Sequence, residues 1–396
     1  MEFKMKEVYS IEKDVMLGGI NPNGAARFLS LDVFRGITIC LMIIVNSPGK
    51  GAQLYPYLVH AKWLGFTLAD LVFPSFLFAV GNAMSFSMNK LEAGGNTIFF
   101  GKVIKRTLIV FLIGYLMYWF PFFKAAADGA WVFKPISETR IMGVLQRIAL
   151  CYFFTALLVH YFSQRVQLII AALILLAYWT VLYWFGDKGE ALTMSGNAIT
   201  KLDLFLLGEG HVYKKDVIPF DPEGILSTLP AIVNVLAGYW VGLFIQKKGK
   251  TFECLTGLMV ASVVLITLAL WWNLIFPISK KLWTSPFVLY TIGIDALMLS
   301  VLIYSVEIRK WKFATNFFNI FGKNPLFIYL LSELLFITLM LIKLPSGQSV
   351  FEWFSIEIFQ AVLPGPFGSF MTAIAFMLIC WLAGWWLDRK KIYIRI

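Results

Sequence analysis

The chain contains about ten apolar runs, each long enough to cross a membrane as a helix. Roughly 20 helical residues span the ~30 Å hydrocarbon core. Hydrophobic residues make up 59% of the 396 residues and charged residues only 14%, against about 25% in soluble domains. The sequence therefore predicts an all-α, polytopic membrane helix bundle of about ten transmembrane helices. The predicted spans lie near residues 30–47, 67–88, 107–123, 141–162, 166–186, 224–245, 252–276, 284–306, 317–342 and 369–387.

Lys and Arg are unevenly divided between the two sets of predicted loops. One set, which includes the loops around Lys90, Lys247 and Arg309, is rich in bases, whereas the opposite loops carry nearly as many acids as bases. An excess of Lys and Arg marks the cytoplasmic side of a membrane. We therefore predict that both termini are cytoplasmic.

Three regions follow from this topology. They are a cytoplasmic tail over residues 1–29, a transmembrane bundle over 30–388 and a second cytoplasmic tail over 389–396. The exterior loop 187–223 is too polar for the membrane and is predicted to form a cap over the outer face. Because the cytoplasmic loops are short, any chemistry must occur in the bundle itself.

Composition excludes two other kinds of site. The net charge of +11 occurs in small clusters between apolar runs, which favours membrane loops over a nucleic-acid surface. No cysteine has the spacing of a zinc or iron–sulfur ligand, so we predict four buried thiols and no metal site. The cysteines are Cys40, Cys151, Cys254 and Cys380.

Polar residues concentrate near the start of the bundle. Asp32, Arg35 and Asn46 lie in the first span, Asp70 lies in the second, and His60 lies in the hairpin between them. Charged groups within a bilayer are costly and usually line a pathway or a reaction site. The first two spans are therefore predicted to build a polar site.

Several segments resemble one family. They are RFLSLDVFRGITICLMIIVNSPG from Arg27, HAKWLGFTLADLVFPSFLFAVG from His60, RIMGVLQRI from Arg140, FDPEGILSTLPAIVNVLAGYWVG from Phe220, KKLWTSPFVLYT from Lys280 and FGKNPLFIYLLS from Phe321. In combination they resemble the transmembrane acetyltransferases related to lysosomal heparan-alpha-glucosaminide N-acetyltransferase and its bacterial relatives. The resemblance implies acetyl-CoA as co-substrate, an amino sugar or glycan terminus as acceptor, and a bacterial inner membrane as location.

Acetyl transfer from a thioester to an amine needs a base, donors for an oxyanion and a clamp for a phosphate-bearing carrier. His60 is the predicted base, because histidine titrates near physiological pH. Asn46 could donate to the carbonyl oxygen, and Asp70 could orient His60. Each residue also has a structural alternative. His60 could be an interfacial histidine, Asn46 a turn residue before Ser47, and Asp70 a carboxylate that caps a helix start.

Four residues are candidates for coenzyme A binding. Lys323 and Asn324 lie toward the cytoplasmic side, where they either contact phosphates or pack at a helix break before Pro325. Arg35 is a further candidate, although an internal ion pair with Asp32 is the economical explanation. Arg147, deep in the fourth span, should meet a ligand or a carboxylate such as Asp70, Asp295 or Glu333, because a buried guanidinium needs a partner.

Two functions remain. The first is a membrane-embedded enzyme that uses cytoplasmic acetyl-CoA to N-acetylate a glucosamine-type amino sugar at the outer face. The alternative is a solute transporter or flippase whose buried charges form a pathway. Direct attack by the amine is favoured, while an acetyl-histidine route and a homodimer both remain open.

Overall fold

The computed structural model describes residues 28–125, 130–214 and 218–394, so most of the predicted N-terminal tail lies outside the described residues. Apart from a small hairpin of β1 (Phe123–Ala125) and β2 (Trp131–Phe133), the described residues form helices and loops. The all-α prediction is confirmed. The long helices are α2 (Leu29–Asn46), α3 (Leu68–Glu92), α4 (Asn96–Trp119), α5 (Val144–Tyr161), α6 (Gln164–Phe185), α8 (Thr228–Lys248), α9 (Phe252–Asn273), α10 (Ser285–Leu302), α11 (Thr315–Lys323), α12 (Pro325–Leu341) and α14 (Pro366–Arg389).

Eight helices of the described chain are long and apolar enough to cross a membrane, or nine if α11 and α12 together form one span. Helix α4 is also long, with 24 residues, but its first half carries Lys102, Lys105 and Arg106. With α4 included, the helices account for the predicted spans. The number and apolar character of these helices identify the chain as a multi-pass membrane protein.

Two predicted spans differ from the helices observed. The span predicted at 317–342 is broken at Asn324, and its two parts are bent by 84°. Pro325 explains this break, because proline lacks an N–H and disfavours a helical residue before it. The span predicted at 107–123 begins earlier, at Asn96, and ends at Trp119, two residues before Pro121.

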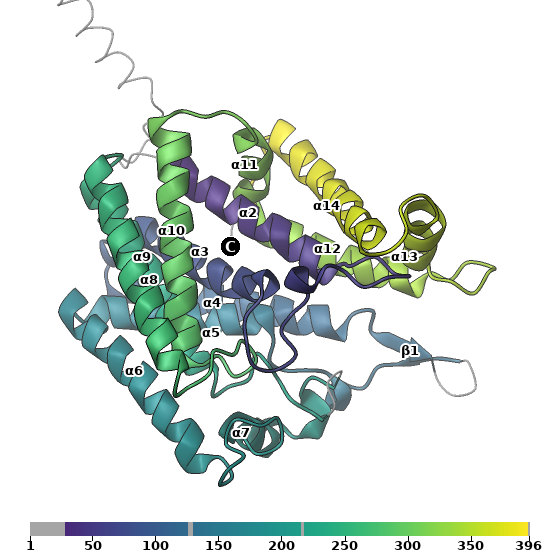
Figure 1. The fold of residues 1–396 in the computed structure, drawn as a ribbon, viewed down its shortest axis with the longest axis horizontal. Helices are drawn as coiled ribbons and strands as arrows, with labels where there is room; N and C mark the ends of the chain where they lie inside the picture. The colour runs from purple at the N-terminus through teal and green to yellow at the C-terminus, as the bar shows by residue number, and fades with distance from the viewer. Residues whose placement is uncertain (1–27, 126–129, 215–217, 395–396) are drawn as a thin grey trace, which may run out of the picture.

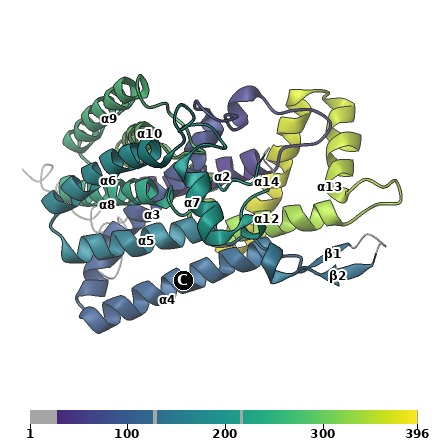
Figure 2. The same ribbon diagram turned by 90° about the horizontal axis from the view of Figure 1, so that it is seen from below.

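The helices are joined by short turns at one end of the bundle and by long segments at the other. Turns of two or three residues connect α3 to α4, α5 to α6 and α8 to α9. In Figure 1, α8, α9 and α10 lie together on one side, α12 and α14 lie on the other, and α2 runs through the middle from α10 toward α12. Figure 2 shows α4 and α5 running alongside each other, with β1 and β2 projecting beyond them. The segments that carry the polar site residues, 47–67, 120–143 and 274–284, all lie at the end with the long connections.

Helix α3 is held against α8 by close backbone contact. A Cβ atom on Gly81 would come within 1.8 Å of the Val235 carbonyl oxygen, and one on Gly238 within 2.0 Å of the Phe78 carbonyl oxygen. Small residues allow such approach between membrane helices. The start of α3, which carries Asp70, is therefore fixed to a rigid pair of helices.

The predicted cap, residues 187–223, folds into a compact segment in its described part. It contains α7 (Ala198–Leu207) and a single 3-10 turn, Glu209–His211. Ile199 and Phe220 of this segment pack with Tyr178, Phe276 and Leu282 in an apolar cluster separate from the main core. The cap is thus anchored to α6 and to the connection between α9 and α10.

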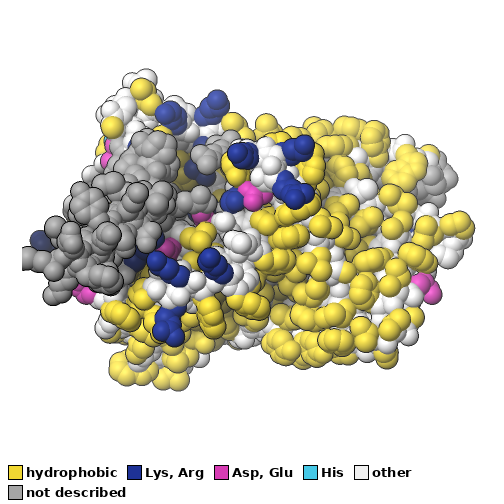
Figure 3. Space-filling model, turned by 90° about the horizontal axis from the view of Figure 1, so that it is seen from above, with side chains coloured by type: hydrophobic (Ala, Val, Ile, Leu, Met, Phe, Trp, Pro, Cys, Tyr) yellow, Lys and Arg dark blue, Asp and Glu magenta, His cyan; other side chains and the backbone are white. Residues whose placement is uncertain are grey.

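Side chains are segregated on the surface. Figure 3 shows one face on which Lys and Arg side chains gather on the left and in the centre, while hydrophobic side chains cover most of the right. A broad apolar surface of this kind is expected where helices meet lipid.

Candidate active site

The His60 hairpin, residues 47–67, is fixed at its beginning by α14 and the segment before it. Ser369 donates from Oγ to the Gly49 carbonyl oxygen at 2.9 Å. Ser355 likewise donates to the Lys50 carbonyl oxygen at 2.9 Å. These bonds satisfy backbone groups that a loop would otherwise leave unpaired.

The end of the hairpin is joined to the connection between α9 and α10. Gly65 donates its N–H to Ile278 O at 2.8 Å, and Ser279 Oγ donates to Trp63 O at 2.7 Å. Gly65 has a φ of +104°, a conformation that strongly favours glycine. Gly65 is a turn glycine, with nothing within 4 Å of the place of a Cβ atom.

Asp70 uses its two carboxylate oxygens for different purposes. Oδ2 accepts hydrogen bonds from the N–H groups of Ala61 at 3.1 Å and Thr67 at 3.0 Å, and from Thr67 Oγ1 at 3.1 Å. Oδ1 lies 2.9 Å from His60 Nδ1. The hydrogen bonds that capping requires and the contact that orienting His60 requires are therefore both made by one buried side chain.

His60 lies at the surface of the site, with 39% of its side chain exposed, whereas Asp70 is 1% exposed. An ionised carboxylate only accepts hydrogen bonds, so His60 Nδ1–H is the donor and Nε2 carries the lone pair of the neutral ring. Partial burial and the neighbouring Lys280 lower the pKa of His60, and Asp70 opposes them. The arrangement is that of a partly exposed histidine hydrogen-bonded to a buried carboxylate.

Lys280 is a site residue that the sequence argument missed. It lies in the connection between α9 and α10, and its Nζ is 3.2 Å from His60 Nε2. The only sequence signal was its place at the start of the KKLWTSPFVLYT segment. Nothing local in the sequence brings it to a histidine 220 residues away.

Asn46 lies at the end of α2, as predicted, but its amide is directed to another helix. Nδ2 donates to Glu333 Oε1 of α12 at 2.9 Å. Each Asn side chain has two N–H groups. One of these N–H groups donates to Glu333. Asn46 makes no hydrogen bond to His60 in the described structure.

A second charged cluster joins two of the quoted sequence segments. Arg140 donates from Nε to Asp221 Oδ2 at 2.9 Å and from NH2 to Glu223 Oε2 at 2.6 Å. Its guanidinium lies over the rings of Tyr118 and Tyr213. Although burial alone would raise the pKa of Glu223, Arg140 and Arg147 hold it below its ordinary value. The cluster therefore favours the ionised form of Glu223, at the end of the bundle that carries the long connections.

Arg147 contacts none of the three carboxylates that were expected as its partners, and contact with a ligand stays a prediction. Arg147 is fully buried, donates to Gly224 O at 3.0 Å and to Ser227 Oγ, and lies 4.8 Å from the centre of the Trp283 ring. Carbonyl and hydroxyl oxygens and an aromatic face thus stabilise the cation in place of a direct carboxylate contact. The bend just before α8 provides these oxygens, and sequence spacing gives no sign of it.

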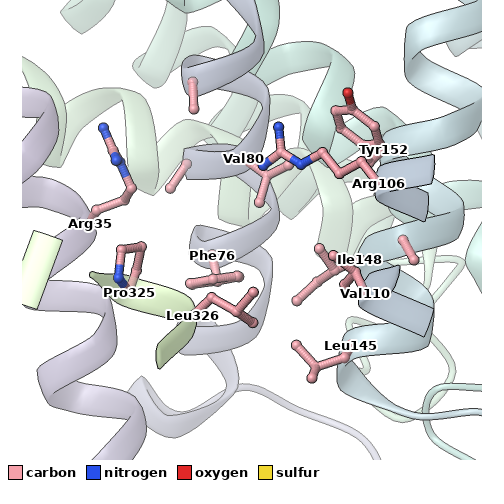
Figure 4. Close-up of a pocket in the computed structure, with 13 residues that line it drawn as sticks. Arg35, Phe76, Val80, Arg106, Val110, Leu145, Ile148, Tyr152, Pro325 and Leu326 are labelled. Atoms are coloured by element: carbon pink, nitrogen blue, oxygen red, sulfur yellow. The ribbon is translucent and has the colours of Figure 1, made fainter. Parts of the chain in front are cut away.

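A cavity of about 130 Å³ lies between α2, α3, α4, α5 and α12. Its walls are mainly apolar, with two guanidinium groups, those of Arg35 and Arg106, among them. Figure 4 shows these two groups toward one end and Phe76, Leu326 and Leu145 toward the other. The predicted ion pair of Arg35 with Asp32 is confirmed at 2.9 Å. Arg106 lies 4.6 Å from the centre of the Tyr152 ring. It is a further candidate for coenzyme A binding that was not predicted from the sequence.

Lys323 and Asn324 bind the end of the chain and do not line this cavity. Lys323 Nζ forms an ion pair with Asp388 Oδ1 at 2.7 Å. Asn324 Nδ2 donates to Ile392 O at 3.0 Å, and its Oδ1 accepts from Ile394 N at 2.8 Å. Pro325, one residue later, does line the cavity, so both residues lie beside its wall.

The other candidates for special chemistry have structural partners. His211 lies 2.8 Å from the Thr139 carbonyl oxygen, and His160 stacks on Phe99. All four cysteines are free and buried, as predicted. In the described part of the chain, no group of three His, Cys, Asp or Glu residues is arranged to hold a metal ion.

Comparison with known proteins gives one consistent result. Residues 27–271 match the family model described as "Heparan-alpha-glucosaminide N-acetyltransferase, catalytic". The chain is 28% identical to the heparan-alpha-glucosaminide N-acetyltransferase of Mus musculus over 371 residues, which is 79% of this chain and 54% of the mouse protein. It is also 28% identical to the Homo sapiens protein of that name, over 76% of this chain and 52% of the human one. The chain thus spans about half the length of these relatives.

Proposed function

Because the chain belongs to the heparan-alpha-glucosaminide N-acetyltransferase catalytic family, we propose that it is a membrane-embedded, acetyl-CoA-dependent acetyltransferase. Its acceptor is the amine of a glucosamine-type sugar at the outer face of a bacterial inner membrane. Both termini and the acetyl-CoA donor are cytoplasmic. The observation that carries the proposal is the pair of His60 and Asp70, with His60 Nδ1 2.9 Å from Asp70 Oδ1 and Nε2 directed away from the carboxylate.

The proposed reaction is a direct transfer. The amine nitrogen attacks the thioester carbonyl carbon, and the carbonyl oxygen becomes an oxyanion. His60 Nε2 accepts a proton from that nitrogen while Asp70 stabilises the imidazolium. The carbon–sulfur bond then breaks, and the imidazolium returns the proton to the departing sulfur. The products are an amide and coenzyme A thiol.

Asn46 is the proposed donor to the oxyanion. Its bond to Glu333 fixes the amide plane and uses one N–H group, so the second N–H can be directed to a thioester oxygen. A preorganised donor of this kind typically contributes about 10²- to 10³-fold to rate.

The cavity is the proposed path of the donor. Phe76 lies in its wall six residues after Asp70 on α3, which corresponds to about 9 Å of helix. The apolar walls suit an extended pantetheine arm, and Arg35 and Arg106 suit the phosphates. Lys323 and Asn324, which precede Pro325 in the chain, are proposed to contact coenzyme A phosphates at the entrance of the cavity. Arg147 is proposed to stabilise the site through its contact with the Trp283 ring.

Turnover is the decisive test. Purified protein given acetyl-CoA labelled in the acetyl group and free glucosamine should produce labelled N-acetylglucosamine and an equal amount of coenzyme A thiol. His60→Ala is the matched control. Uptake of label into vesicles without release of thiol would instead support the transporter.

The covalent alternative can be separated from direct transfer. A neutral imidazole is a competent acyl acceptor. Incubation with labelled acetyl-CoA in the absence of sugar, followed by rapid quench and peptide mapping, should leave His60 unlabelled. Stoichiometric and chemically competent labelling of His60 would replace direct transfer by an acetyl-histidine route.

Sidedness is tested by cysteine labelling of intact cells. The four native cysteines are buried, which keeps the background low. Lys188→Cys, in the cap, should react with an impermeant maleimide, whereas Lys248→Cys should react only after the membrane is permeabilised. The reverse pattern would invert the proposed orientation.

A further inference from the structure

Lys280 lies close to both ring nitrogens of His60. Its Nζ is 3.3 Å from Nδ1 and 3.2 Å from Nε2. The Nδ1–H bond and the Nε2 lone pair point in different directions within the ring plane. Because the two distances are nearly equal, the ammonium lies along neither direction. It therefore does not occupy the lone-pair axis of Nε2.

The backbone that carries Lys280 is attached to the His60 hairpin. Ser279, the preceding residue, accepts from Leu282 N through Oγ and donates from Oγ to Trp63 O. Ser279 N also donates to Thr284 Oγ1 at 3.1 Å. On the other side, Lys281 lies over the Trp63 ring. The position of Lys280 is thus determined by several bonds outside its own side chain.

The charges around His60 come from three elements. Asp70 at the start of α3 is in direct contact, the ammonium of Lys280 from the connection between α9 and α10 lies 3.2 Å from Nε2, and Glu223 before α8 acts from farther away. A buried carboxylate beside a histidine favours the imidazolium, which cannot accept a proton. An ammonium beside the ring nitrogens disfavours that form. With Lys280 present, the oriented histidine remains a base.

We propose that Lys280 is a positioning residue that keeps His60 in its neutral form, with Asp70 holding the proton on Nδ1 and Nε2 available to the acceptor amine. This inference rests on the proposed function for its biological meaning. Its physical content, the charge state of the ring, can be measured without any reaction.

The direct test is an NMR titration of the His60 ring carbon in the purified full-length protein, without acetyl-CoA or sugar. The chain has three histidines, so His160→Gln and His211→Gln assign the His60 signal. Lys280→Met should move the titration of His60 to higher pH, because the remaining Asp70 and Glu223 favour the imidazolium. Lys280→Arg should keep the wild-type midpoint.

Lys62→Met is the matched control, since Lys62 is an exposed lysine two residues from His60. It should leave the midpoint in place. An unchanged midpoint in Lys280→Met would overturn the inference, as would an equal shift in Lys62→Met. If Lys280→Met does not fold, Lys280→Gln tests the same loss of charge with a polar side chain.

The kinetic consequence separates positioning from a purely structural role. If the proposed function holds, Lys280→Met should lose several-fold more activity at pH 6 than at pH 8. The acid limb of its pH–rate profile for acetyl transfer should therefore move to higher pH. A structural defect would lower the rate by the same factor at every pH. A shifted NMR midpoint in a protein without acetyl transfer would retain the inference about His60 and reject the proposed function.

Discussion

The two ends of the proposed reaction path are built in different ways. At the His60 end, the essential pair lies ten residues apart, and local capping bonds at the start of α3 hold the carboxylate. At the cavity end, Arg35 and Arg106 come from two different helices, and neighbouring cations such as Lys323 are held by residues far along the chain. Two residues that lie close together in the sequence, such as His60 and Asp70, can be recognised as a pair. Whether a cation is paired with a carboxylate far along the chain, as Lys323 is, cannot be recognised from the sequence.

The difference also separates chemistry from binding. His60 is partly exposed and is held by a carboxylate and an ammonium, as a proton acceptor requires. The cavity has apolar walls and two guanidinium groups, as a carrier with phosphates requires. Changes at the first end should therefore affect kcat, and changes at the second should affect KM for acetyl-CoA.

The largest effect is expected for His60→Ala. Loss of the base should reduce kcat by roughly 10²- to 10⁴-fold, while acetyl-CoA binding measured by calorimetry stays close to wild type. Weaker acetyl-CoA binding with unchanged kcat would place His60 in the donor site. Wild-type turnover would remove His60 from the mechanism.

Asp70→Asn should reduce kcat by about 10²-fold, because an amide can present its N–H to Nδ1 and favour the wrong tautomer. Its capping bonds from Ala61 and Thr67 would also be weakened. Thermal unfolding should therefore be measured beside activity. A variant that loses stability but keeps kcat would show that Asp70 serves the helix start alone.

Arg106→Met and Arg35→Met should each raise KM for acetyl-CoA by about tenfold or more, since hydrogen bonds to charged groups contribute about 1.5–3 kcal/mol. KM for the sugar should change little. Lys102→Met is the matched control, because Lys102 is an exposed cation on the same helix as Arg106 and does not line the cavity. Equal effects at Lys102 and Arg106 would point to general electrostatics and away from a defined phosphate site.

Lys323→Ala should give the smallest effect, a modest rise in KM for acetyl-CoA that exceeds any change in KM for the sugar. Its ammonium is already paired with Asp388, and exposed or half-exposed pairs contribute about 0–1 kcal/mol. Asp388→Asn releases Lys323 and should not raise KM. A larger effect at Lys323 than at Arg106 would move the phosphate site to the junction of α11 and α12.

The sequence determined the membrane class and the approximate place of every long helix. Apolar length and the charges between the runs are local properties, and a membrane leaves an apolar run few alternatives to a helix. The contact between His60 and Asp70 could also be predicted from the sequence, because the hairpin that carries His60 leads directly into the start of the helix that carries Asp70. Pro325 indicates the break between α11 and α12, although the span predicted at 317–342 continues through it.

Only the tertiary structure decided which charged groups meet. Lys280 reaches His60 because Gly65 and Ser279 join two loops more than 200 residues apart. Arg147 uses the oxygens of Gly224 and Ser227 instead of a carboxylate, because the bend before α8 turns them toward it. Arg106 enters the cavity wall through the packing of α4 on α5. These contacts depend on how helices and loops are placed in three dimensions, and residue type and spacing do not encode that placement in any local pattern.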